Sequence, residues 1–251
     1  MTAVAAASRF DMGAVFKRGA GAVGRNLVVY GLLGLMLSAI PQAISEWATA
    51  KASVPGSYGF LGLRVVATIA VYVGYYILQG ALVFGMVQDL NGRSADFGQC
   101  LRSGLSRAVP LFGLAIVSGL AILMGFFLFV IPGIYLALMW MVAGPAIIAE
   151  RKGVFDSMSR SSRLTEGHRW SLLGLSLIFF VAALLLAILI AIVPGILVAV
   201  SGAADLVTPV VSGVSQAVFT VLGAALIASV YVELRSIKEG ATPETLAAIF
   251  D

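Results

Sequence analysis

Residues 172–193 read LLGLSLIFFVAALLLAILIAIV, and this stretch decides the class of fold. It contains no charged side chain, and sixteen of its residues are Leu, Ile, Val or Phe. A helix needs about 20 apolar residues to cross the hydrocarbon core of a bilayer. Each large aliphatic residue near the bilayer centre favours insertion by roughly 0.3–0.6 kcal/mol. The stretch is therefore predicted to be a transmembrane helix.

The rest of the chain has the composition of a membrane protein. Hydrophobic residues make up 60% of the 251 residues, against about 45–50% in soluble proteins. Charged residues make up 11%, against about 25%. A water-soluble protein of this length cannot cover its surface with so few charges, so lipid is the solvent for most of the chain.

Five further apolar stretches are long enough to cross a membrane. The six predicted spans are residues 27–48, 63–90, 109–130, 133–149, 170–193 and 209–232. We expect one all-α integral membrane domain that occupies the whole chain, 1–251. Residues 195–208 are small and apolar, and they are compatible with either an interfacial helix or a re-entrant turn.

The six spans are predicted to form three hairpins that repeat one unit. Each unit is a short basic amphipathic segment followed by two spans, over residues 10–90, 91–150 and 151–235, with a tail of residues 236–251. A Pro-Gly pair follows a β-branched residue near the outer turn of each hairpin, where it predicts a helix break. These helix-break positions are Pro55, Gly56, Pro132, Gly133, Pro194 and Gly195. The pattern predicts a pseudo-threefold arrangement.

The distribution of basic residues predicts the orientation. Six spans place both termini on one side of the membrane, together with 14 of the 16 Lys and Arg residues. Lys51 and Arg64 lie on the other side. Lys and Arg accumulate on the cytoplasmic side of membrane proteins. We therefore expect a multi-pass protein of the bacterial inner membrane with cytoplasmic N- and C-termini.

The basic segments between the spans are amphipathic. In residues 97–108, Phe97, Cys100 and Gly104 share one helical face, and Arg102 lies on the other. We expect such helices to lie in the interface, with apolar faces toward acyl chains and arginines toward anionic headgroups. The candidate headgroup contacts are Lys17, Arg18, Arg102, Arg107, Arg160 and Arg163. Because these cations flank spans, the basic charge predicts lipid partners and no nucleic acid.

Three carboxylates end the second span of each unit, at Asp89, Glu150 and Glu233. They are candidate functional residues, because ionisable groups in spans are costly. One interpretation is an interfacial ion pair for each, with the cations that follow it at Arg93, Arg151 and Lys152, and Arg235. The other is convergence around the pseudo-threefold axis to bind a cation, a proton or a lipid amine.

Motifs for catalysis or metal binding are absent from the sequence. The chain has one cysteine, Cys100, and one histidine, His168, which excludes an internal disulfide and a His-rich or Cys-rich metal cluster. No P-loop, Gly-x-Ser-x-Gly or paired His/Glu spacing occurs. We expect no enzyme, no metal and no cofactor. Tyr72, Tyr75 and Tyr76 fall within the second span, where their hydroxyls need partners, and they predict a polar interior beside it.

Several short motifs together resemble a known family. They are Pro132-Gly133-Ile134-Tyr135-Leu136, Pro145-Ala146-Ile147-Ile148-Ala149-Glu150, Ser157-Met158-Ser159-Arg160-Ser161, and Leu164-Thr165-Glu166-Gly167 with Trp170. The chain resembles an uncharacterised family of six-span bacterial membrane proteins, similar to the membrane domain attached to some glycerophosphoryl diester phosphodiesterases. The match is specific over residues 129–170. The resemblance implies a membrane module, with no catalytic residue to transfer.

Two hypotheses of function follow. The first is a non-enzymatic protein that binds lipid or scaffolds membrane partners, as a homo-oligomer or with another membrane protein. The alternative is a transporter or channel for a small or lipidic solute, since internal repeats and broken helices are common in transporters. A third hypothesis is an accessory subunit of an envelope enzyme whose partner supplies catalysis.

Overall fold

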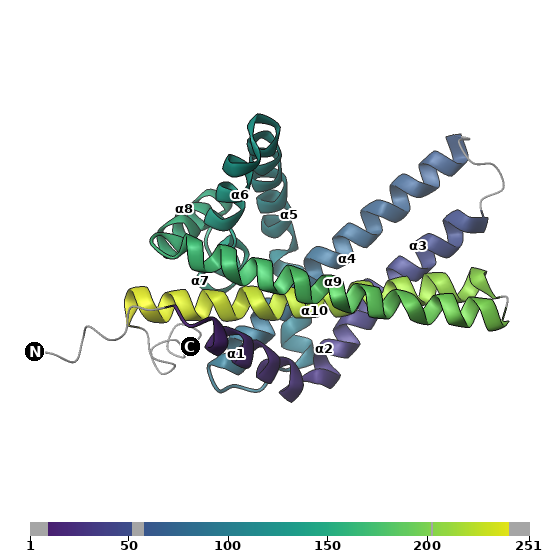
Figure 1. Ribbon diagram of the computed structural model, residues 1–251, viewed down its shortest axis with the longest axis horizontal. Coiled ribbons are helices and arrows are strands. Elements are labelled where there is room, and N and C mark those ends of the chain that lie inside the picture. The colour runs from purple at the N-terminus through teal and green to yellow at the C-terminus, as the bar shows by residue number, and fades with distance from the viewer. Residues whose placement is uncertain (1–9, 52–57, 202, 241–251) are drawn as a thin grey trace, which may run out of the picture.

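The computed structural model describes residues 10–51, 58–201 and 203–240, and the elements within these ranges are all helical. In chain order they are α1 (Met12–Arg25), α2 (Leu27–Gly34), the π-helical turn η1 (Leu35–Ala39), α3 (Ile40–Lys51), α4 (Tyr58–Leu90), α5 (Phe97–Leu128), α6 (Val130–Met139), α7 (Ala143–Glu150), α8 (Val154–Thr165), α9 (Arg169–Ser201) and α10 (Ala204–Glu239) (Figure 1).

Six stretches of these helices are long and apolar enough to cross a membrane. They are Leu27–Ala48, Gly59–Leu90, Phe97–Leu128, Val130–Glu150, Arg169–Ile196 and Val207–Glu239. The prediction of an all-α protein with six membrane-spanning segments is therefore confirmed. The first span combines α2, η1 and α3, and the fourth combines α6 and α7.

In Figure 1, α4, α5 and the neighbouring helices α9 and α10 point in three different directions. The buried core includes Tyr30, Met86, Ile147 and Tyr231. The spans contribute to it very unequally. In α10, 61% of the most apolar window is buried, whereas 0% of the corresponding window of α9 is buried. The most hydrophobic helix of the chain is therefore a peripheral one, because lipid itself solvates its side chains.

Glycines bring the helices into backbone contact. A Cβ atom on Gly104 of α5 would collide with the carbonyl oxygen of Ile77 in α4. A Cβ on Gly74 or Gly213 would likewise collide with a carbonyl oxygen of η1. Small residues drive such packing in membranes, where helices gain little from hydrophobic burial against one another.

The fourth span is interrupted at residues 140–142, and α8 caps the interruption. The Ser161 hydroxyl donates to the Met139 carbonyl at 2.8 Å and accepts from the Val142 amide at 3.3 Å. The Thr165 hydroxyl also reaches the Met139 carbonyl, at 3.3 Å. Backbone groups freed inside a membrane protein need such partners, so α8 completes the fourth span.

The predicted helix breaks differ from the observed ones. At Pro194 and Gly195 the prediction is wrong, because α9 continues through both residues to Ser201. A proline removes one backbone hydrogen bond, and membrane helices tolerate this where neighbouring groups compensate. Residues 195–201 thus extend α9 and residues 204–208 open α10, rather than forming a separate interfacial helix or a re-entrant turn.

The other two predicted breaks have different outcomes. Phe129 is extended, with φ −162° and ψ 155°, and separates α5 from α6. Pro132 and Gly133 therefore lie in the first turn of α6, where a proline such as Pro132 gives up no helical hydrogen bond and costs little. Pro55 and Gly56 lie outside the described residues, as does the tail beyond Gly240. Residues 236–239 of the predicted tail belong to α10.

The basic segments are helical, and several of their small residues face protein. Residues 97–108 are not a separate helix, because they open the continuous α5. Cys100 and Gly104 there pack against α4, and Gly19 of α1 packs against Ala225 and Ser229 of α10. The prediction that these faces contact acyl chains is therefore wrong for Cys100 and Gly104, because glycine lets a neighbouring backbone approach closely. Leu105 of α5 and Phe155 of α8 are exposed.

Candidate functional site

Each of the three predicted carboxylates pairs with an arginine from α1 or α8. The Asp89 carboxylate accepts from Arg25 Nε at 3.2 Å and from Asn26 Nδ2 at 2.7 Å. Glu233 pairs with Arg18, which lies 215 residues earlier in the chain. Each carboxylate side chain is at most 10% exposed, so its charge is balanced by a cation rather than by bulk water.

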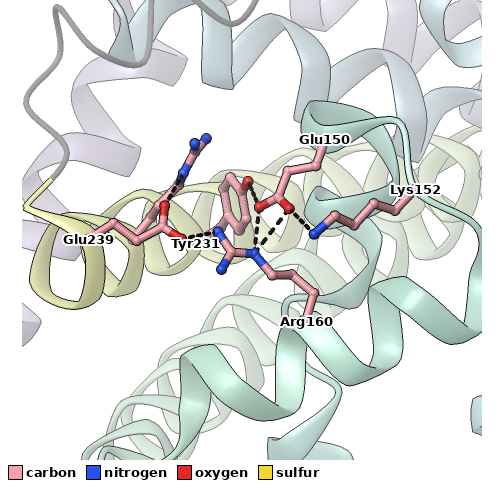
Figure 2. Close-up of polar contacts among 6 residues, drawn as sticks. Glu150, Lys152, Arg160, Tyr231 and Glu239 are labelled. Carbon is pink, nitrogen blue, oxygen red and sulfur yellow. Dashed lines mark hydrogen bonds and ion pairs between the residues drawn. The ribbon is translucent and has the colours of Figure 1, made fainter.

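Glu150 lies at the centre of a polar cluster (Figure 2). Arg160 Nε donates to both carboxylate oxygens, at 2.8 and 3.0 Å. Lys152 Nζ lies 2.7 Å from Oε2. The Tyr231 hydroxyl donates to Oε1 at 2.8 Å. The carboxylate thereby joins α7 and the turn after it to α8 and α10.

The cluster continues from Arg160 to the end of α10. Arg160 also pairs with Glu239, which accepts from Arg235 Nε at 2.8 Å (Figure 2). The side chains of Arg160 and Arg235 are 15% and 10% exposed. Burial works against the charge of Arg160, but its hydrogen bonds to Glu150 and Glu239 outweigh burial and raise its pKa. These contacts make Arg160 a structural cation.

The partners differ from those the sequence suggested. Lys152 pairs with Glu150 as expected, but Asp89 and Glu233 pair with arginines of α1 rather than with Arg93 and Arg235. No three His, Cys, Asp or Glu side chains lie close enough to hold a metal ion within the residues that the structure describes. The pairs Arg18–Glu233 and Arg25–Asp89 could not be predicted from the sequence, because only the tertiary fold places α1 beside these carboxylates.

The six candidate headgroup contacts fall into two groups. Arg18 and Arg160 are engaged in the ion pairs described above. Lys17, Arg102 and Arg163 are exposed and Arg107 is half-buried. The structure brings Arg102 and Arg107 of α5 together with Arg151, which follows α7. We call the cavity between them the arginine cavity.

The arginine cavity has a volume of about 250 Å³. It is lined by Phe84, Gln99, Arg102, Ser103, Ser106, Arg107, Ile148 and Arg151. No carboxylate is part of this lining. Within the described ranges none of its three arginines forms an ion pair. The cavity therefore concentrates positive charge.

Arg151 reaches this position at the cost of a strained backbone. Its φ of 53° and ψ of 32° place it in the left-handed region at the end of α7. Glycine is the usual residue at such a helix end, since an L side chain there is disfavoured by roughly 1–2 kcal/mol. An arginine at this position is unusual, and strained residues often mark functional sites.

A second, larger cavity lies between α3, α4 and α10, and we call it the polar cleft. Its volume is about 590 Å³. It is lined by Gln42, Ser45, Glu46, Arg64, Thr68, Val71, Tyr72, Tyr75 and Gln216. Tyr72 and Tyr75 line this cleft, whereas Tyr76 packs edge-on against Phe112. The polar interior beside the second span stays a prediction.

Local structure at η1 orients the polar side chains of α3. A π-helical turn adds one residue to the helical turn, which rotates the following helix by roughly 100°. Gln42 and Glu46 then lie one turn apart. The Glu46 carboxylate accepts from Gln42 Nε2 at 2.9 Å and from the Ser212 hydroxyl of α10 at 2.7 Å. Sequence reasoning missed Glu46 because no pattern revealed that it faces α10.

Comparisons with known proteins agree with the membrane architecture. UPF0259 membrane proteins of Yersinia pestis bv. Antiqua (strain Angola) and Yersinia pseudotuberculosis serotype O:3 (strain YPIII) are each 27% identical over 130 residues. That region covers 52% of this chain and 51% of each relative, so the chain spans about half the length of the curated relatives it matches. No solved structure matches significantly.

The comparisons also bear on the predicted family. They support a bacterial family of membrane proteins, while the resemblance to phosphodiesterase membrane domains stays a prediction. The model of the family described as a domain of unknown function, DUF7847, matches residues 10–234. This match includes both cavities and all three carboxylates, and the chain belongs to the DUF7847 family.

Proposed function

We propose that this protein is a non-enzymatic membrane protein that binds anionic lipid headgroups in the arginine cavity. The observation that carries the proposal is the composition of the lining, which combines three arginines with Ser103, Ser106 and Gln99 and contains no carboxylate. Guanidinium groups bind phosphate through two parallel hydrogen bonds, and hydroxyl and amide groups donate further ones.

The position of the cavity supports a lipid as the source of the phosphate. The cavity lies at the start of α5 and the end of α7, on the side that the basic residues predict to be cytoplasmic. The cytoplasmic leaflet is rich in anionic lipids, and each well-placed Lys or Arg adds about 1 kcal/mol of attraction. Phe84 and Ile148 on its wall offer apolar surface beside the cations.

Native mass spectrometry of the full chain in mild detergent tests the proposal. We expect phosphatidylglycerol to bind more tightly than diacylglycerol, which has neither phosphate nor charge. The double variant Arg102→Gln with Arg107→Gln should weaken phosphatidylglycerol binding by about fivefold per arginine. Arg163→Gln is the matched control, because Arg163 is exposed on α8 and does not line the cavity. If Arg163→Gln weakens phosphatidylglycerol binding equally, the lipid binds to a diffuse basic surface rather than in the arginine cavity.

Arg151→Gly separates lipid binding from stability. Glycine accepts the left-handed backbone of this position without strain, so the melting temperature should not fall. Binding of phosphatidylglycerol should still weaken by about fivefold, because one of the three cations is gone. A variant that binds phosphatidylglycerol as well as the natural chain would exclude Arg151 from the site.

Transport of a small or lipidic solute is the second candidate function. The polar cleft favours it, because Glu46 and Arg64 lie within membrane-spanning segments, and such residues often mark a solute path. Flux into proteoliposomes, compared between the natural chain and Glu46→Gln, tests this candidate. Scaffolding of a membrane partner, an enzyme included, is tested by co-purification in the same detergent.

A further inference from the structure

The polar cleft follows one face of α4 for a long distance. Arg64, Thr68, Tyr72 and Tyr75 are spaced by four, four and three residues, which places them on the same side of the helix. Arg64 and Tyr75 are eleven residues apart, which is about 16 Å along an α-helix. The cleft therefore extends from near the start of the second span to its middle.

Opposite walls of the cleft carry opposite charges. The carboxylate comes from Glu46 of α3 and the guanidinium from Arg64 of α4, and both helices lie in membrane-spanning segments. Gln42, Thr68 and Gln216 add uncharged polar groups. Gln42 and Ser212 donate to the Glu46 carboxylate. Lipid tails offer no hydrogen bonds to polar groups of this kind, and ionisable residues in membrane-spanning segments often mark functional sites. The cleft thus suits a polar occupant rather than acyl chains.

The chemistry of the walls selects the class of occupant. A carboxylate attracts an ammonium group, and the faces of tyrosine rings stabilise cations further. A guanidinium attracts a phosphate or a carboxylate. A ligand with one charge only would be attracted by one wall and repelled by the other. A ligand that carries both charges matches both walls.

We propose that the polar cleft binds a zwitterion that carries an ammonium and a phosphate or carboxylate group. The ammonium lies at Glu46, between the rings of Tyr72 and Tyr75 and the amide of Gln216, and the anionic group lies at Arg64. A lipid headgroup such as phosphoethanolamine and a free small zwitterion share this chemistry. The cleft is separate from the arginine cavity, and the proposal does not depend on anionic lipid binding there.

Binding of phosphatidylethanolamine to the purified full chain, measured by native mass spectrometry, tests the proposal. Phosphatidylglycerol supplies the anion alone, and dioleoyl-trimethylammonium-propane supplies the cation alone. Phosphatidylethanolamine should bind most tightly to the cleft. Glu46→Gln and Arg64→Gln should each weaken it by about tenfold, the effect expected from losing one charge-assisted contact. Asp156→Asn, an exposed carboxylate on α8, is the matched control and should bind normally.

Soluble phosphoethanolamine, titrated calorimetrically, distinguishes the two sources. Binding that both variants weaken identifies a site for free zwitterions, and binding of phosphatidylethanolamine without phosphoethanolamine identifies a lipid site. Either result supports the proposal.

Arg64→Gln alters an exposed side chain, so it remains informative if Glu46→Gln fails to fold. The proposal is overturned if folded variants bind phosphatidylethanolamine like the natural chain. The arginine-cavity variants should leave this binding unchanged, which keeps the two proposals independently testable.

Discussion

At the residue scale, the ion pairs of this protein differ in how far they are removed from water. Glu150 and Arg160 are 10% and 15% exposed, and their contact belongs to a network of six hydrogen-bonded or paired residues (Figure 2). Arg25, which pairs with Asp89, has a side chain that is 60% exposed, although the Asp89 side chain is 8% exposed. Exposed pairs contribute little to stability, whereas breaking a buried pair leaves an uncompensated charge.

Glu150→Gln should therefore destabilise the protein strongly. The amide keeps the shape of the side chain but leaves Arg160 with one carboxylate instead of two, at a cost of about 3 kcal/mol. Arg163→Gln changes an exposed side chain of α8 outside this cluster, so it is the comparison variant and should cost less than about 1 kcal/mol. Melting temperatures of the two variants in the same detergent measure the difference. Equal melting temperatures would mean that the cluster does not stabilise the fold.

At the element scale, helix contacts depend on single glycines that periodicity does not distinguish. Gly104 of α5 contacts the backbone of α4, whereas a Cβ atom on Gly119 of the same helix would meet no atom within 4 Å. The sequence predicts close packing at Gly31, Gly34, Gly119 and Gly125. Gly34 meets Ala217 and Gly125 meets Gly133, but Gly31 and Gly119 have open space.

Gly104→Ala and Gly119→Ala form a matched pair of variants. The new methyl group at residue 104 would collide with the Ile77 carbonyl, and overpacking of this kind costs about 1–3 kcal/mol. At residue 119 alanine meets nothing and raises helix propensity by up to about 1 kcal/mol. We expect the melting temperature to fall for Gly104→Ala and to stay or rise for Gly119→Ala. The opposite order would contradict the observed packing of α5 on α4.

At the scale of the whole molecule, orientation remains a prediction from the basic residues. Cysteine labelling suits this protein, because its one natural cysteine, Cys100, is fully buried. Gly59→Cys and Arg163→Cys place thiols at exposed positions near the start of α4 and near the end of α8. A membrane-impermeant maleimide should label Gly59→Cys in intact spheroplasts and Arg163→Cys after permeabilisation. The reverse pattern would show an inverted topology.

The sequence by itself determined the all-helical membrane class and the number of spans. Insertion of a span depends mainly on the summed hydrophobicity of its own residues, so residues 172–193 could be recognised without knowledge of their neighbours. The same locality explains the errors. Pro194 and Gly195 suggested a break, but helix continuity at these residues depends on their surroundings. The periodicity of the amphipathic segments does not reveal whether protein or lipid covers each face.

The tertiary structure alone decided which side chains meet. Arg18 reaches Glu233 across 215 residues of sequence. Arg102 and Arg107 gain Arg151 as a third cation, and Glu46 meets the polar face of α4 and Ser212 of α10. Each of these encounters joins different helices, and the relative placement of the helices depends on packing at glycines rather than on local propensity. Both proposed binding sites therefore became visible only when the helices were assembled.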